Sequence, residues 1–79
     1  MKLEKRSLRI AGHRTSVALE PEFWAAVERL AYARGVSIPV LCAMVDQTRV
    51  KEDQSLASAL RVQALTFAQD QAQARAAWP

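Results

Sequence analysis

Cysteine, histidine and glycine are scarce in this 79-residue chain, which holds one Cys, one His and two Gly. The single cysteine, Cys42, excludes an intrachain disulfide and a cysteine-rich zinc cluster. Two glycines are too few for a glycine-rich phosphate loop, and the serines lie in no triad or nucleophile-elbow pattern. Neither His13 nor Cys42 has carboxylates around it at ligand spacing. The sequence therefore predicts no enzyme, no metal site and no cofactor.

Long hydrophobic runs are also missing. The longest, Ile38 to Val45, is far too short to span a bilayer. The charged start, Met1 to Arg6, leaves no room for the hydrophobic region of a signal peptide. We expect a cytoplasmic protein that does not enter membranes. Because 79 residues lie near the lower limit for an adequate core, dimerisation would relieve a shortage of buried apolar surface.

Positive charge is concentrated at the N-terminus. Residues 1–14 hold five basic side chains and one acidic one, whereas residues 15–79 hold six basic and seven acidic side chains. The net charge of +3 thus comes entirely from the first 14 residues. A basic arm of this kind is typical of proteins that contact phosphate or an anionic surface. The alternative is a solvated, disordered leader that only aids solubility.

Two segments, Arg6 to Ile10 and Arg14 to Leu19, alternate polar and apolar residues, as half-buried strands do. In the first, Leu8 and Ile10 are even-numbered, whereas in the second, Val17 and Leu19 are odd-numbered. One uninterrupted strand would place these pairs on opposite faces, so the chain must turn, bulge or break around Ala11-Gly12. The pattern leaves open whether the first segment is a separate short strand or a flexible arm.

The strand from Arg14 to Leu19 cannot satisfy its own backbone hydrogen-bonding groups. Its simplest partner is the same strand of a second copy, which predicts a two-stranded ribbon shared by a homodimer. The expected fold is mainly α, with one short N-terminal strand that pairs antiparallel across the dimer, two core helices and a third C-terminal helix.

Local signals predict where the helices begin and end. The first helix starts at Pro21, whose fixed φ suits the first helical position, and stops at Gly35. The second begins with Ser37 as its N-cap and is apolar almost all round, so we expect it to be buried between two subunits. The third starts at Ser55. The expected dimer core consists of Val17, Leu19, Phe23, Val27, Leu30, Ile38, Leu41 and Val45, with Trp24 at the dimer seam or partly exposed.

The sequence resembles the ribbon-helix-helix DNA-binding proteins over roughly Arg14 to Arg49. The blocks that carry the closer resemblance, to a small subgroup, are Lys5-Arg6-Ser7, Ile10-Ala11-Gly12-His13-Arg14-Thr15-Ser16, Glu20-Pro21-Glu22-Phe23-Trp24 and Ser58-Ala59-Leu60-Arg61-Val62. The resemblance divides the chain into a basic arm (1–13), a ribbon-helix-helix core (14–49) and a C-terminal helix with its tail (50–79).

The resemblance implies that paired strands enter the major groove and that their outer face reads base edges. Because Val17 and Leu19 face inward, the matching readers are Arg14, Ser16 and Ala18, of which Arg14 can donate two hydrogen bonds to guanine. The start of the second helix would bind a phosphate through Ser37 and Val40, although Pro39 lacks an N–H. The remaining residues expected to contact the DNA backbone are Lys5, Arg6, Arg9 and His13.

The function implied by these features is sequence-specific binding of double-stranded DNA by a homodimeric bacterial transcriptional regulator, a repressor in type. The alternative is an antitoxin-like or adaptor protein in which residues 55–79 hold a protein partner. The third helix motivates this alternative, because it exceeds the minimal fold. A different interpretation of the third helix is that it only covers the hydrophobic core and binds no partner.

Overall fold

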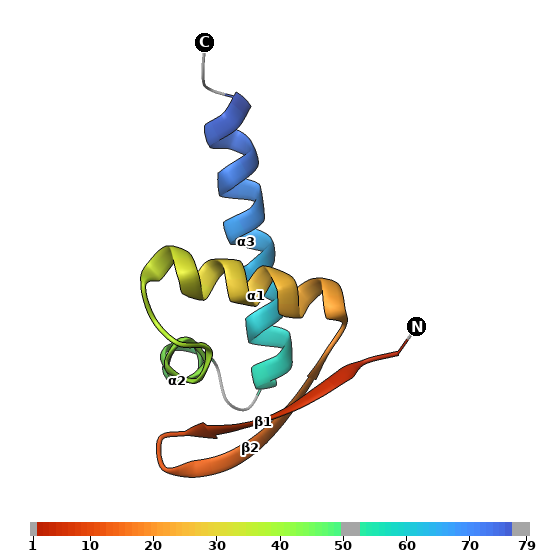
Figure 1. Ribbon diagram of the computed structural model, residues 1–79, viewed down its shortest axis with the longest axis vertical. Helices are drawn as coiled ribbons and strands as arrows, with labels where there is room; N and C mark the ends of the chain where they lie inside the picture. The colour runs from red at the N-terminus through yellow and green to blue at the C-terminus, as the bar shows by residue number, and fades with distance from the viewer. Residues whose placement is uncertain (1, 50–52, 77–79) are drawn as a thin grey trace.

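The computed structural model describes residues 2–49 and 53–76, which form a β-hairpin followed by three helices (Figure 1). The strands are β1 (Glu4–Ile10) and β2 (His13–Leu19), and the helices are α1 (Pro21–Arg34), α2 (Ile38–Thr48) and α3 (Leu56–Ala76). All three helices lie on one side of the hairpin, and α3 crosses α1 and projects away from the strands. None of these three helices lies on the opposite face of the hairpin. The expected mainly α ribbon-helix-helix architecture is confirmed, with two strands in place of one.

The strands pair antiparallel within one chain, so the expected pairing partner from a second copy is not needed for β2. The register joins Ile10 to His13 and Glu4 to Leu19. A two-residue turn makes this possible, because Ala11 and Gly12 both have positive φ, 52° and 83°. That combination defines a type I′ turn, whose twist matches that of the flanking strands. The segment that the sequence left as either strand or arm is therefore a strand.

The turn leaves Ala11 in a left-handed conformation that an L-alanine adopts only at a cost of about 1–2 kcal/mol. Asparagine tolerates this region better, and Asn-Gly is the favoured pair for a type I′ turn. Ala11→Asn is therefore expected to raise the free energy of unfolding by about 0.5–1 kcal/mol, measured by urea denaturation. The same change at Ala33, which lies in α1, should lower it because asparagine is a weaker helix former. A loss of stability with Ala11→Asn would contradict the turn assignment.

The helix boundaries agree with the local signals. Helix α1 starts at Pro21, and Gly35 ends it with a left-handed φ of 69°. Its N–H donates to the carbonyl of Tyr32, and the N–H of Val36 donates to Ala31. Ser37 caps α2, because its Oγ accepts the N–H of Val40 at 3.3 Å. Ser55 caps α3 in the same way through the N–H of Ser58, at 3.1 Å between N and Oγ.

The core lies between the inner face of the hairpin and the three helices. Trp24 is fully buried, and its indole N–H donates to the main-chain carbonyl of Glu4 at 2.7 Å. The prediction that Trp24 lies at the dimer seam or is partly exposed is therefore wrong, because the ring is covered within one chain, and Phe23 is the half-buried aromatic of the pair. Strand β1 contributes to this burial, because the carbonyl of Glu4 and the guanidinium of Arg6 both contact the indole. The fully buried large side chains are Trp24, Leu19, Leu30, Leu41, Leu60, Val27 and Cys42.

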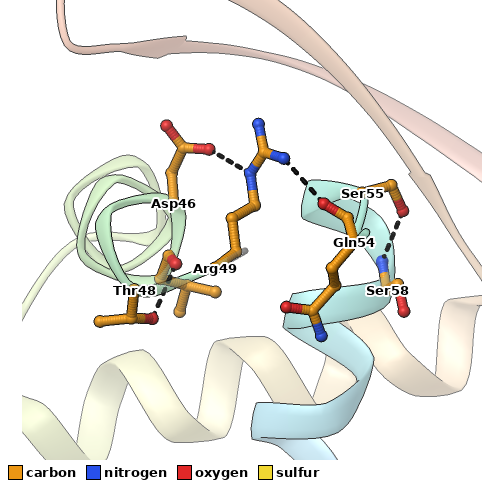
Figure 2. Close-up of polar contacts among 7 residues, drawn as sticks. Asp46, Thr48, Arg49, Gln54, Ser55 and Ser58 are labelled. Atoms are coloured by element: carbon orange, nitrogen blue, oxygen red, sulfur yellow. Dashed lines mark hydrogen bonds and ion pairs between the residues drawn. The ribbon is translucent and has the colours of Figure 1, made fainter. Parts of the chain in front are cut away.

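Arg49 ties the end of α2 to the start of α3 (Figure 2). Its Nε lies 2.5 Å from Asp46 Oδ1, one turn back in α2, and its Nη1 donates to the carbonyl of Gln54 at 2.8 Å. The guanidinium thereby links two segments that flank residues 50–52. This link brings α3 back over the core, where Ala59, Leu60 and Ala64 are buried.

Candidate nucleic-acid interface

The hairpin face that points away from the helices is basic. The two-residue turn makes even-numbered residues of β1 share a face with odd-numbered residues of β2, so the phase change in the sequence unites the apolar residues on the inner face. Ile10, Val17 and Leu19 are accordingly all buried. The face opposite to them, called the outer face below, consists of Lys5, Ser7, Arg9, Arg14, Ser16 and Ala18. All six except the half-buried Ala18 are exposed.

Arg9 and Arg14 stand directly opposite each other next to the turn. The Cβ atoms of such cross-strand pairs are about 4.5–5.5 Å apart, and like charges at this position destabilise a hairpin. The ion pairs among residues 2–49 and 53–76 involve Arg6, Arg49 and Arg61, so no carboxylate of these residues lies within 4.0 Å of the Arg9 or Arg14 guanidinium. Folding gains nothing from two unneutralised arginines side by side. Their arrangement suits an anionic ligand.

Arg6 points to the other face, so its placement does not support the expected contact with DNA phosphate. Its Nε lies 2.6 Å from Glu4 Oε2, its Nη1 lies 3.0 Å from Glu28 Oε2, and its guanidinium carbon lies 4.5 Å from the centre of the Trp24 ring. The hydrogen bond to Glu4 raises the pKa of Arg6 above its ordinary value. This residue joins β1 to α1. The difference between Arg6 and Arg9 was present in the alternation, because Arg6 has the parity of the apolar Leu8 and Ile10 and Arg9 does not, but both were assigned to the DNA backbone as basic residues of one arm.

The other expected phosphate contacts are less favourably placed. By register His13 lies on the inner face, opposite Ile10, although its side chain is exposed at the end of the hairpin. At the start of α2 the N–H of Val40 already donates to Ser37 Oγ, and Pro39 has no N–H. The cap thus occupies one of the donors that a phosphate at this helix would use.

The residues expected in a dimer core mostly form the core of a single chain. Val17, Leu19, Val27, Leu30, Leu41 and Val45 are buried, whereas Phe23 and Ile38 are half-buried against them. The fold-back of β1 and the packing of α3 supply the cover that was expected from a second subunit. On α2 the apolar side chains that stay open are Val40 and Met44, which are 47% and 41% exposed.

Ser7 is the outer-face residue that sequence reasoning missed. It lies directly opposite Ser16, one of the expected base readers. Lys5 and Arg9 were expected to follow the DNA backbone, but they share the face of Arg14 and Ser16. The phase change at Ala11-Gly12 could have placed Lys5, Ser7 and Arg9 on this face. A two-residue turn pairs even-numbered residues of β1 with odd-numbered residues of β2, so the apolar residues of both strands share one face and these three lie on the other.

Other chemistry finds little support in the described residues. Cys42 is buried in the core, and this burial raises the pKa of its thiol to about 11, so the thiol stays protonated and inert at neutral pH. Within residues 2–49 and 53–76, no three His, Cys, Asp or Glu side chains gather as a metal site would require. None of the helices in this part of the chain combines the length and hydrophobicity of a membrane crossing.

A groove of about 690 Å³ lies between α1 and the projecting half of α3. Small and aromatic side chains line it, together with two arginines, the carboxylate of Glu28 and the amide of Gln71. They include Ala25, Arg29 and Tyr32 of α1 and Phe67, Ala72 and Arg75 of α3. Tyr32 is 89% exposed at its edge. This groove lies on α1 and α3, away from the outer face of the hairpin.

Comparisons with known proteins agree with this architecture. The sequence model of one protein family, described as a ribbon-helix-helix domain, matches residues 3–68 and therefore includes both strands, α1, α2 and the buried half of α3. Searches of curated proteins and of solved structures found no match. Proteins of the matched family are in general DNA-binding regulators without enzymatic activity. The chain belongs to the ribbon-helix-helix domain family.

Proposed function

We propose that this protein is a homodimeric transcriptional regulator, a repressor in type, that binds double-stranded DNA sequence-specifically through the outer face of its hairpin. The observation that carries the proposal is the outer face itself, where Lys5, Arg9 and Arg14 are exposed without any acidic residue. A two-stranded ribbon fits the major groove, which is about 12 Å wide. Helices cover the other face, so only this one is free to approach DNA.

Base reading is assigned to Arg14 and Ser16, with Ala18 in apolar contact at most, and backbone contact to Lys5. The guanidinium of Arg14 can donate two hydrogen bonds to guanine O6 and N7, which is worth about 1–3 kcal/mol of discrimination. The hydroxyl of Ser16 can donate to or accept from several bases and discriminates less. The remaining proposed phosphate contacts come from Ser37 and Val40 at the start of α2 and from His13 at the end of the hairpin. They add to the contacts of the outer face where both ends face the same DNA.

Dimerisation is supported by α2 rather than by strand pairing. Val40 and Met44 expose apolar surface on one side of α2, where a second copy can cover them. A dimer would present two hairpins, so the operator should contain two half-sites, inverted or repeated. Met44→Glu is then expected to leave a folded monomer, detected by sedimentation. Monomers of the wild-type protein at the same concentration would contradict the dimer.

The DNA-binding proposal is tested by selection from random-sequence duplexes with the purified protein. The wild-type protein should enrich one site, and Arg14→Ala should lose that enrichment while its thermal unfolding midpoint is no lower than that of the wild type and the dimer stays intact. The matched control is Arg75→Ala, which removes the same charge from the far end of α3. Recovery of the same site by Arg14→Ala would exclude Arg14 as a reader. No enrichment by the wild-type protein would contradict the function.

A second candidate function is an antitoxin-like or adaptor role in which the C-terminal half of α3 binds a protein partner. The groove beside Tyr32 and Phe67 favours it, and the exposed Arg29 and Arg75 along its sides suit a partner helix with acidic residues. Deleting residues 55–79 cannot test this role, because it removes the buried Leu60. Truncation after Phe67 keeps the buried half of α3 and should release a bound partner, whereas a partner retained by the truncated protein would contradict the role.

A further inference from the structure

The outer face of the hairpin is built from cross-strand pairs, with one member on each strand. From the turn outward the pairs are Arg9 with Arg14, Ser7 with Ser16 and Lys5 with Ala18. We propose that β1 is a second base-reading strand, and that Arg9 and Arg14 together form a guanine-reading pair at the turn end of the hairpin. The proposal rests on the proposed DNA binding and specifies what the same face recognises.

Strand geometry lets both members of each cross-strand pair reach equally far into the major groove. Neighbouring strands lie about 4.7–4.9 Å apart, so both strands of one hairpin fit side by side in a groove about 12 Å wide. Residues directly opposite each other project on the same side of the sheet. If the guanidinium of Arg14 reaches the edge of one base, the guanidinium of Arg9 reaches the edge of a neighbouring base. One chain therefore carries a complete reading ribbon.

The ion pairs of β1 distinguish Arg9 from the other arginine of the strand. Arg6 is held by Glu4 and Glu28 on the inner face, so its guanidinium is already engaged by two carboxylates there. Arg9 is exposed and lies outside the four ion pairs found in the described part of the chain. Its donors, together with those of Arg14, are free for the two acceptors that guanine presents in the major groove. Acceptors bound between the two arginines would reduce their mutual repulsion.

The order of the pairs predicts a gradient of specificity along the site. Successive outer-face pairs are two residues apart, about 6.8 Å along an antiparallel strand. Bases of one DNA strand rise by about 3.4 Å, so the three pairs cover about four base-pair steps. Two arginines should demand guanines at the turn end, and two serines should discriminate weakly in the middle. Lys5 and Ala18 should add phosphate contact but little sequence preference at the open end.

Arginine-to-lysine substitutions separate base reading from phosphate contact. Lysine keeps the charge but loses the planar fork that matches guanine O6 and N7. The experiment selects sites from random duplexes with four proteins, each checked by thermal unfolding: wild type, Arg9→Lys, Arg14→Lys and the control Arg75→Lys. We expect each hairpin variant to lose guanine preference at one position, a different one for each, by about 5- to 150-fold. The control should return the wild-type site.

The possible outcomes bear differently on this proposal and on the proposed function. If Arg14→Lys alters the site and Arg9→Lys does not, β1 is no reading strand, although the proposed function stands. In that case Arg9→Gln should weaken all sequences alike and lower the slope of log affinity against log salt by about 0.9, as expected for a phosphate contact. If the wild-type protein enriches no site, both are overturned. Loss of guanine at two separate positions supports the reading pair.

Discussion

Leu60→Ala is expected to lower the free energy of unfolding by about 2–5 kcal/mol. Leu60 is fully buried in α3, where it closes the core over α1, α2 and the hairpin. Its truncation removes apolar contacts and leaves a cavity that rigid neighbours fill only in part. A chain of 79 residues has a total stability of roughly 4–12 kcal/mol, so this single change would remove a large part of it.

The matched control for Leu60→Ala is Val62→Ala. Val62 lies in the same helix and is 51% exposed, so its truncation should change the free energy of unfolding by less than about 0.5 kcal/mol. Both values come from urea denaturation of the purified variants. Equal effects at the two positions would mean that α3 does not pack as described, and the third helix would then be free for a partner along its whole length.

Trp24→Ala is expected to lower the free energy of unfolding by about 3–5 kcal/mol, a large part of the total stability of so small a chain. Trp24 is fully buried, and its indole N–H donates to the main-chain carbonyl of Glu4 in β1. The same ring lies under the guanidinium of Arg6, at 4.5 Å to the ring centre. Its loss therefore leaves a large cavity and also removes two contacts that hold β1 on α1.

Phe23→Ala provides the comparison, because Phe23 is adjacent in sequence but only half-buried. Its truncation should cost clearly less than that of Trp24, since less of its surface leaves water on folding. Far-ultraviolet circular dichroism as a function of temperature measures both variants. If Phe23→Ala were the more damaging of the two, the orientation of α1 on the hairpin would be wrong.

The structure also explains why one chain can keep Arg9 and Arg14 together. Type I′ turns and the buried inner face hold the hairpin closed, and Trp24, Arg6 and Glu28 attach β1 to α1. This support offsets the repulsion between the two arginines. The outer face can then be used for recognition, because the inner face stabilises the hairpin.

Much of the helical structure could be predicted from the sequence because its signals are local. Pro21, Gly35, Ser37 and Ser55 each act within one turn of their own position, through φ or through a capping hydrogen bond. Alternation of polar and apolar residues also predicted that Val17 and Leu19 face inward, and both are buried. These features need no knowledge of distant residues.

The candidate site could be predicted only in part. Arg14, Ser16 and Ala18 were assigned to one face by alternation within β2, and the register keeps them together. The role of β1 was beyond the sequence, because a partner strand from the same chain and one from a second copy satisfy the same backbone groups. Arg6 and Arg9 lie on opposite faces of β1, as alternation with Leu8 and Ile10 requires once the first segment is known to be a strand.

The sequence by itself determined the helix limits, the inward residues of β2 and the basic excess at the N-terminus, because caps, alternation and charge are properties of short segments. Only the tertiary structure decided that the strands pair within one chain, that Trp24 rather than Phe23 fills the core, and that Arg9 joins Arg14 while Arg6 turns inward. Each of these depends on contacts between residues far apart in the chain or across a turn. A local pattern is compatible with several such contacts, and packing selects among them.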